Sequence, residues 1–267
     1  MRDLQPKHSL AEITARLTKL PSETRRIALE QVANMAGVSF RLARLFADRA
    51  PFIAERFPPA AFKAWADFGR KLAIIAPDAA SNFFVSELPA NFDKIPLGLL
   101  PKIFELASKQ LILSSSNAVG SLSLIPEFVD SFEEKELDAL LELAAAIADR
   151  SAQHSSNFLA ETPRVAKALN AFGKERALVF NSAIRLMHEL TARAGGLSAD
   201  LWAMLPTALE QLSPQQAVIL LDSASAFLRF GGSATLHFVN AASSVLRSSP
   251  EVFESWNRLA CTLGDKR

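Results

Sequence analysis

The sequence has one cysteine, Cys261, no tyrosine and only ten glycines in 267 residues. A single cysteine excludes an intramolecular disulfide, a cysteine-rich zinc site and a Cys-x-x-Cys redox pair. It fits a reducing, cytoplasmic setting. Few glycines beside nineteen phenylalanines disfavour an all-β chain, which needs a turn glycine about every ten residues. We therefore expect helices to dominate.

Neither sign of charge is in excess, because 29 basic side chains stand against 28 acidic ones, a net charge of +1. Proteins whose main task is to neutralise phosphates carry clustered Lys and Arg, so we do not expect nucleic acid as the partner. No segment reaches the roughly 20 uncharged apolar residues of a membrane span. The amphipathic N-terminus also lacks the apolar core of a secretory signal. We expect a cytoplasmic protein with no membrane span.

A proline recurs at a nearly fixed interval and marks an internal repeat. Each marker follows an apolar pair and precedes another apolar residue by six positions. The first four markers lie 38, 37 and 37 residues apart and are Pro51, Pro89, Pro126 and Pro163. A fifth copy carries Pro206, and a weaker sixth near 236–246 has no proline. Because proline is tolerated at the first position of a helix, we expect each marker to open a short helix.

Two further helices are predicted before each marker proline. Twelve residues upstream of the first four markers stand residues that commonly start helices, namely Ser39, Pro77, Ser114 and Ser151. They predict a second helix of about ten residues. A longer helix precedes it, since apolar residues three or four apart fall on one face; these are Phe62, Trp65, Phe68 and Leu72, and Leu137, Leu140, Leu143 and Ile147. Capping boxes are predicted to begin at Ser9, Ser131 and Ser213.

These patterns predict an all-α fold, an α-α superhelix of the HEAT/ARM-like solenoid kind. Each repeat of about 37 residues would hold a long helix, a shorter helix and a short proline-opened helix, none able to bury its apolar stripe alone. We predict one helical-repeat domain over 1–267, with units that end near 57, 95, 132, 169, 212 and 247. Residues 250–267 form either a half-repeat or a C-terminal cap.

No motif of catalysis, cofactor binding or metal binding is complete. His188 and Glu189 begin an H-E-x-x-H pattern, but Ala192 stands where the second histidine is needed. G-x-S-x-G, Walker and G-x-G-x-x-G sequences are missing. His154, among polar neighbours, is interpreted as a surface or groove residue. We therefore predict no catalytic, cofactor or metal residue, no cofactor, and leave open whether the chain is an enzyme.

The tryptophans, the cysteine and a pair of adjacent glutamates are interpreted as structural residues. Trp65, Trp202 and Trp256 are predicted to lie in the core, and Cys261 to be a buried thiol. Glu133 and Glu134 are adjacent acids of the kind that the helix macrodipole favours at a helix start. We therefore do not interpret them as catalytic carboxylates.

Arginines gather in the first unit, at Arg41, Arg44, Arg49 and Arg56. With Asp48 and Glu55 interleaved, we interpret them as a solvated helix face. The alternative is a binding surface for an acidic partner or a nucleic acid. The nucleic-acid alternative requires these arginines to join Arg150, Arg164 and Arg193 in one stripe.

Two segments, WADFGRKLAIIAPDAASNFF at 65–84 and LLELAAAIADRSAQHSSNFL at 140–159, resemble the α-helical repeats that precede the von Willebrand A domain in the activator proteins NorD and CbbO. The resemblance covers about 62–259. The chain departs from that family because it has no D-x-S-x-S motif; Asp222, Ser223 and Ser225 do not have the required order. The resemblance implies a partner-binding module of a chaperone-like activator that works with a MoxR-type ATPase, and it implies no catalytic residue.

The sequence therefore favours a non-catalytic protein–protein interaction scaffold, whose concave face, lined by the shorter helices, grips a protein or peptide. One alternative is an enzyme with an unrecognised site in a pocket between helices. The other is a nucleic-acid-binding helical repeat protein, whose binding would weaken steeply with salt.

Overall fold

The computed structural model describes residues 15, 17–86 and 92–264, and throughout these residues all regular elements are helices. The all-α prediction is confirmed. The chain divides into two compact units, a first unit of Met1–Pro126 and a second of Glu127–Arg267. Among the described helices, none is both long enough and apolar enough to cross a membrane.

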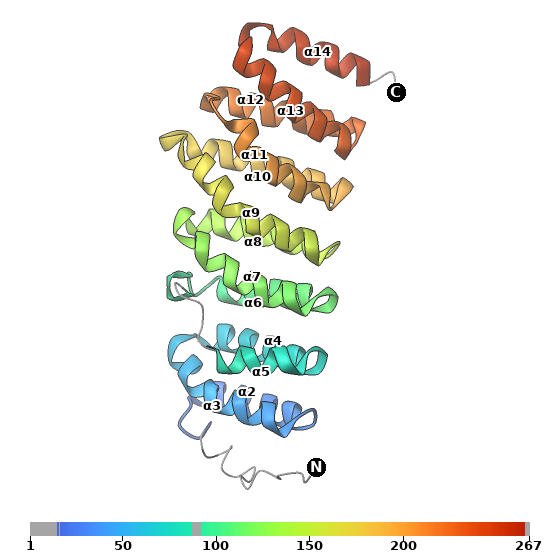
Figure 1. Cartoon of the computed structure of the whole chain (residues 1–267). Coiled ribbons are helices and arrows are strands. Elements are labelled where there is room, and N and C mark those ends of the chain that lie inside the picture. The colour runs from blue at the N-terminus through green and yellow to red at the C-terminus, as the bar shows by residue number, and fades with distance from the viewer. Residues whose placement is uncertain (1–14, 16, 87–91, 265–267) are drawn as a thin grey trace. The chain divides into compact units, whose positions relative to one another are not determined.

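Antiparallel helix pairs build the first unit (Figure 1). Its elements are α2 (Ser22–Ala36), α3 (Phe40–Arg56), α4 (Pro59–Ile75), α5 (Pro77–Val85), the 3-10 turn η1 (Phe92–Lys94), α6 (Leu100–Leu113) and α7 (Ser115–Phe128), which ends two residues past the unit boundary. Helix α4 packs against α2 and α6 on either side and against α5, while α3 packs against α2 and α5. The unit thus has two layers, with α2, α4 and α6 in one.

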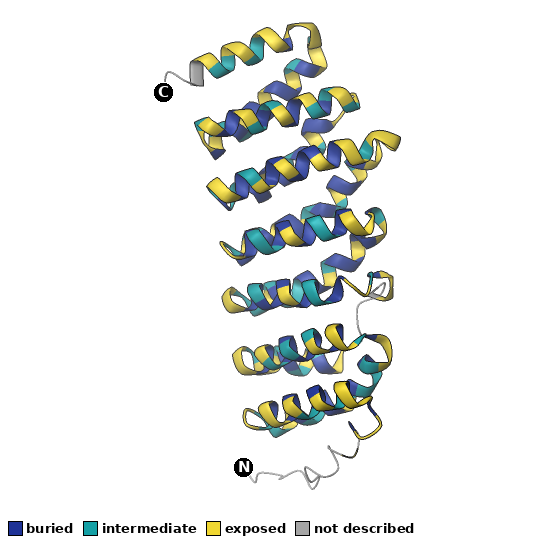
Figure 2. Cartoon of the chain, turned by 180° about the vertical axis from the view of Figure 1, so that it is seen from behind, coloured by how far each residue is buried: buried dark blue, intermediate teal, exposed yellow. Residues whose placement is uncertain are grey.

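The second unit follows the same plan. Its elements are η2 (Val129–Ser131), α8 (Glu134–Ala148), α9 (Ala152–Asn170), η3 (Gly173–Glu175), α10 (Arg176–Ala194), α11 (Leu197–Leu209), α12 (Pro214–Phe227), η4 (Leu228–Phe230), α13 (Gly232–Ser248), η5 (Pro250–Val252) and α14 (Phe253–Gly264). One layer holds α8, α10 and α12, and the other α9, α11 and α13. Buried residues lie along the inner sides of these helices and exposed residues along the outer sides (Figure 2).

The predicted starts of the second helices are confirmed. Ser39 Oγ accepts a hydrogen bond from the amide of Leu42 at the start of α3, and Ser151 Oγ accepts one from the amide of His154 at 3.3 Å. Ser114 Oγ does the same before α7, and Pro77 is the first residue of α5. Each cap satisfies an amide that the first turn leaves without a partner.

Of the three predicted capping boxes, one is confirmed and one is wrong. Ser213 and Gln216 bond reciprocally at the start of α12. At α8 the box is formed by Glu133 and Glu136 instead of Ser131, because Ser131 ends the preceding 3-10 turn and the helix begins two residues later than expected. The box at Ser9 lies outside the described residues.

The marker prolines that the structure describes do not open helices. Four of them lie inside α3, α7, α9 and α11, respectively Pro51, Pro126, Pro163 and Pro206; Pro89 lies outside the described residues. An interior proline costs about 3 kcal/mol, and the apolar residues that follow it are buried, as Val165 and Ala166 are in α9. The four hairpins whose marker proline is described therefore have two helices, not three, and α9 changes direction along its length (Figure 1).

Because the second helix of each of these four pairs continues through its marker proline, it is longer than the roughly ten residues predicted. It is not always the shorter helix of the pair, since α9 has 19 residues and α8 has 15. Several predicted unit ends nevertheless fall beside helix ends. Residues 57, 169 and 247 lie one position from the ends of α3, α9 and α13. The assignment of 1–267 to one domain stays a prediction.

Large aromatic side chains fill the core of each unit. The ring of Trp65 lies 5.2 Å from that of Phe46 and 5.6 Å from that of Phe62, so Trp65 is a core residue as predicted. Trp202 is fully buried, 4.8 Å from Phe158, and its indole Nε1 donates to Thr162 Oγ1 at 3.2 Å. Pairing the indole N–H removes the penalty of burying a polar group.

The core prediction is wrong for Trp256 and Cys261, which are both only partly buried. They lie on α14, which packs mainly on α13 and η5 and reaches α12 through a hydrogen bond from Asn257 to Ser223. Because α13 is the main long helix packed on α14, it covers only one side of α14. Side chains on the remaining surface of α14 therefore stay accessible to solvent.

A buried ion pair joins α8, α10 and η2. Arg176 donates from one terminal nitrogen to Glu136 Oε2 at 2.7 Å and from the other to the carbonyl oxygen of Ser131 at 2.7 Å. The same Oε2 accepts the amide of Glu133 in the capping box. The Arg176 and Glu136 side chains are only 15% and 9% exposed, so loss of either partner leaves a charge in a poorly hydrated place.

Replacement of Trp202 with Ala should lower the free energy of unfolding by about 3–5 kcal/mol, because it opens a large cavity in the core. Replacement of the partly exposed Trp256 with Ala should cost about 1 kcal/mol. Urea unfolding followed by far-ultraviolet circular dichroism measures both. Equal losses in the two variants would contradict the described difference in burial.

Replacement of Arg176 with Met should cost about 3–5 kcal/mol, because Glu136 then keeps a buried charge without its partner. The matched control is Arg258→Met, whose pair with Glu254 is 73% and 80% exposed and should change stability by no more than about 0.5 kcal/mol. The double variant Arg176→Met/Glu136→Met should recover about half of the loss. A single Arg176 variant as stable as the control would show that the pair contributes little.

Candidate functional site

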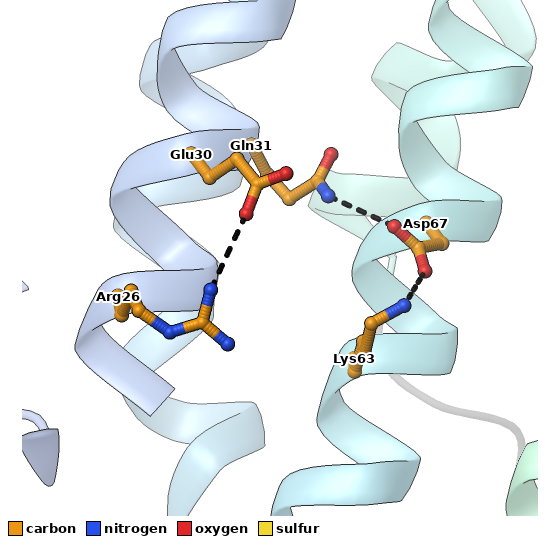
Figure 3. A network of polar contacts seen from close by, with 5 residues as sticks. All are labelled: Arg26, Glu30, Gln31, Lys63 and Asp67. Atoms are coloured by element: carbon orange, nitrogen blue, oxygen red, sulfur yellow. Dashed lines mark hydrogen bonds and ion pairs between the residues drawn. The ribbon is translucent and has the colours of Figure 1, made fainter. Parts of the chain in front are cut away.

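Polar contacts hold neighbouring helices of one layer in register. In the first unit, Gln31 Nε2 on α2 donates to Asp67 Oδ1 on α4 at 2.8 Å, and Lys63 Nζ reaches Asp67 Oδ2 at 2.7 Å (Figure 3). In the second unit, Arg185 on α10 pairs with Asp222 on α12. The partners that bridge two helices are 36 and 37 residues apart. These polar side chains are engaged in helix packing.

Most of the arginines singled out in the sequence have partners within their own unit. Arg44 lies 3.8 Å from Asp48, and Arg56 lies 3.6 Å from Asp93. The guanidinium groups of Arg49 and Arg56 lie over the ring of Phe52 at 4.3 and 4.1 Å. Arg41 is exposed. These contacts favour the interpretation of the arginines as a helix face over that of a continuous cationic binding surface.

The arginines of the second unit bond to neighbouring hairpins. Arg150 donates to the carbonyl oxygen of Ala192 at 3.0 Å, and Arg193 to that of Leu228 at 3.3 Å. Arg164 pairs with Glu161 on its own helix. Cations near carbonyl-rich helix ends interact favourably with the helix dipole, so Arg150 and Arg193 help to hold successive hairpins together.

The candidate histidines do not converge. His154 Nδ1 lies 2.8 Å from Ser151 Oγ, and its ring packs so closely on Gly196 that an added Cβ there would lie 2.8 Å from it. His188 and His237 are exposed on α10 and α13, and His8 lies outside the described residues. Over residues 15, 17–86 and 92–264, no group of three or more His, Cys, Asp or Glu side chains is arranged to hold a metal ion.

An open groove of about 600 Å³ lies in the second unit, where α9 and α11 end and α12 begins. We call it the α9–α11 groove. Its apolar lining includes Ala168, Phe172, Pro206, Leu209, Leu212 and Pro214, and its polar lining includes Arg164, Lys167, Thr207, Glu210 and Gln211. Leu209 and Leu212 are buried, whereas Lys167, Glu210 and Gln211 are exposed. An apolar floor with a rim of both charges can bind a partly apolar ligand and orient it.

Gln211 has an unusual backbone conformation on the rim of this groove. Its φ is 64°, the only positive φ of a non-glycine residue in the described part of the chain. A side chain in the left-handed region costs on the order of 1 kcal/mol. This conformation turns the chain between the end of α11 and the Ser213 cap of α12. Strained residues of this kind cluster at binding sites, which adds to the case for the groove.

Sequence reasoning missed this groove. Its lining comes from two stretches about 40 residues apart that meet at the ends of α9 and α11. Neither stretch carries a motif. The one available signal was the Ser213 and Pro214 helix start, which requires a tight turn just before it.

The fold and the groove define an all-α protein with an open, mixed-charge surface groove. Comparison of the chain with protein-family models, with curated proteins and with solved structures found no match.

Replacement of Gln211 with Gly should raise the free energy of unfolding by about 0.5–1 kcal/mol, because glycine adopts a positive φ without steric cost. The neighbouring control is Glu210→Gly, at an ordinary φ of −56°, which should lower stability by a similar amount or leave it unchanged. Thermal and urea unfolding measure both. A stabilisation common to both variants would argue against strain at Gln211.

Proposed function

We propose that the chain is a non-catalytic scaffold or adaptor for protein–protein interaction, and that its hairpins form a HEAT-like α-α superhelix. Within each unit, successive hairpins pack in two layers, and the polar contacts between α2 and α4 and between α10 and α12 join residues 36 and 37 positions apart. That separation is within two residues of the interval of the marker prolines, which is 37 or 38. Stacked repeats of one length meet at equivalent positions in this way.

The observation that carries the function is the α9–α11 groove. Its volume of about 600 Å³ lies in the range of binding pockets, and it is open along the surface. An extended peptide segment suits it: apolar side chains of the segment would cover Leu209 and Leu212, and its charges would pair with Lys167 and Glu210 on the rim.

A narrower proposal follows from the resemblance to NorD and CbbO repeats. The chain would then be the partner-binding module of a chaperone-like activator, the partner would belong to a MoxR-type ATPase system, and the setting would be cytoplasmic. The pattern of 65–84 and 140–159 supports this proposal, and both segments form helix pairs here, α4 with α5 and α8 with α9.

Filling the groove tests the scaffold function. Ala171 is an exposed lining residue, so Ala171→Trp adds a large side chain there without removing a contact. The matched control is Ala177→Trp, at an exposed position on α10 that does not line the groove. Affinity capture from the native lysate, quantified by mass spectrometry, should recover a protein with the wild-type chain and the control but at least tenfold less with Ala171→Trp.

Washing the captured material at low and at high salt distinguishes the scaffold from the nucleic-acid alternative. A groove-dependent protein that survives high salt supports the scaffold, and a MoxR-type ATPase among such proteins supports the activator proposal. Recovery of nucleic acid alone, lost steeply as salt rises, or equal recovery with both tryptophan variants would contradict the groove as the binding site.

A further inference from the structure

Exposed aliphatic side chains gather at one side of the first unit. Five of them are between 46% and 77% exposed, namely Val38, Ile74, Ile75, Ile112 and Leu113. We call them the aliphatic edge. They lie at the C-terminal ends of α4 and α6 and in the turn after α2, and the α2–α3, α4–α5 and α6–α7 turns are on the same side of this unit (Figure 1).

The packing register places these residues side by side. The bond from Gln31 to Asp67 relates α2 to α4 by 36 positions, and the same step leads from Val38 to Ile74. Helix α4 packs on α6, and residues of both, among them Lys71 and Ser108, line a hollow of about 240 Å³; the repeat interval of 37 leads from Ile75 to Ile112. Packed helices lie about 8–10 Å apart, so the aliphatic edge extends over roughly 20 Å.

The fold does not require apolar residues at these turns. At the corresponding turns of the second unit, Arg150 follows α8 and Arg193 lies in the last turn of α10, and each donates to a backbone carbonyl of the next hairpin. The first unit has Val38, Ile75 and Leu113 at its turns instead. Contiguous exposed apolar surface on a folded protein marks an interaction site more often than scattered residues do.

Basic residues border the aliphatic edge. Arg70, Lys71 and Lys109 precede Ile74, Ile75 and Leu113, respectively, by four residues, so each basic side chain lies one helical turn away on the same face. Arg41 is exposed in the first turn of α3, and Asp78, in the first turn of α5, is the acidic residue closest in sequence to these turns. The border is predominantly positive. A second copy of this edge would bring like charges together, which disfavours self-association through it.

We propose that the aliphatic edge binds an acidic amphipathic helix of a protein partner. A length of roughly 20 Å corresponds to about 13 residues of helix. Apolar residues at i, i+3 or i+4, and i+7 would contact the edge, and Glu or Asp on the flanks would face Arg41, Arg70 and Lys71. This surface rests on the scaffold function proposed above and is separate from the α9–α11 groove.

The test uses the full chain and a fluorescein-labelled synthetic helix of 16 residues with leucine at the amphipathic spacing and glutamate on the flanks. Fluorescence anisotropy should show saturable binding that weakens several-fold in about 0.5 M NaCl, where the Debye length is roughly 4 Å. The variant Ile75→Ser/Ile112→Ser/Leu113→Ser should weaken binding at least tenfold. The control Leu178→Ser/Ile219→Ser changes aliphatics of similar exposure, 53% and 47%, in the second unit and should stay within twofold of wild type.

Circular dichroism melts first establish that both variants are folded. The proposal is overturned if the peptide does not bind, if the triple variant binds it as wild type does, or if peptides with scrambled order or with lysine for glutamate bind equally well. It is also overturned if edge-dependent binding is seen only to vesicles of phosphatidylserine and phosphatidylcholine. Ala171→Trp should bind the peptide normally, so failure of the groove and failure of the edge are separate results.

Discussion

In the described part of the chain, helices such as α4 and α10 need several partners to cover their apolar surface, and the rest of the structure follows from that constraint. The buried side of α4 includes Phe62, Trp65, Phe68 and Leu72, each almost fully removed from solvent, and α2, α3, α5 and α6 all pack against this helix. A fully buried side chain of this size stabilises the fold by roughly 1.5–3 kcal/mol. Each hairpin is therefore stable only when a hairpin lies beside it.

The same constraint explains what happens where neighbours are fewer. Helix α14 packs mainly on α13 and η5, and Trp256 and Cys261 remain partly accessible on it. The residue types of α14 resemble those of an inner helix, with a Phe-x-x-Trp step like that of α4. Burial is thus decided by the number of packed neighbours, and an apolar pattern alone cannot reveal that number.

The sequence predicted the features that depend on residues close together in the chain. Helical spacing identified α4 and α8, and local side-chain chemistry identified the starts of α3, α7, α9 and α12. The role of the marker prolines was not predictable in the same way. Proline opens a helix by local preference, but burial of residues such as Val165 beyond Pro163 compensates for the broken hydrogen bond and keeps α9 continuous.

The candidate site escaped prediction for a related reason. Its lining residues come from the ends of α9 and α11, and its rim depends on a left-handed backbone at Gln211, a conformation that glutamine rarely adopts. Periodicity finds the faces that helices turn toward each other. It gives no information about hollows between their ends.

The turns between paired helices show how one architecture can present two different surfaces. In the second unit, Arg150 and Arg193 use the turns to bond the next hairpin, so these positions contribute to cohesion. Contacts within one layer link neighbouring helices in both units, from Gln31 to Asp67 in the first and from Arg185 to Asp222 in the second, but the turns of the first unit carry Val38, Ile75 and Leu113. Because these three side chains are exposed, they contribute little apolar burial to the fold, and their surface is available for a partner.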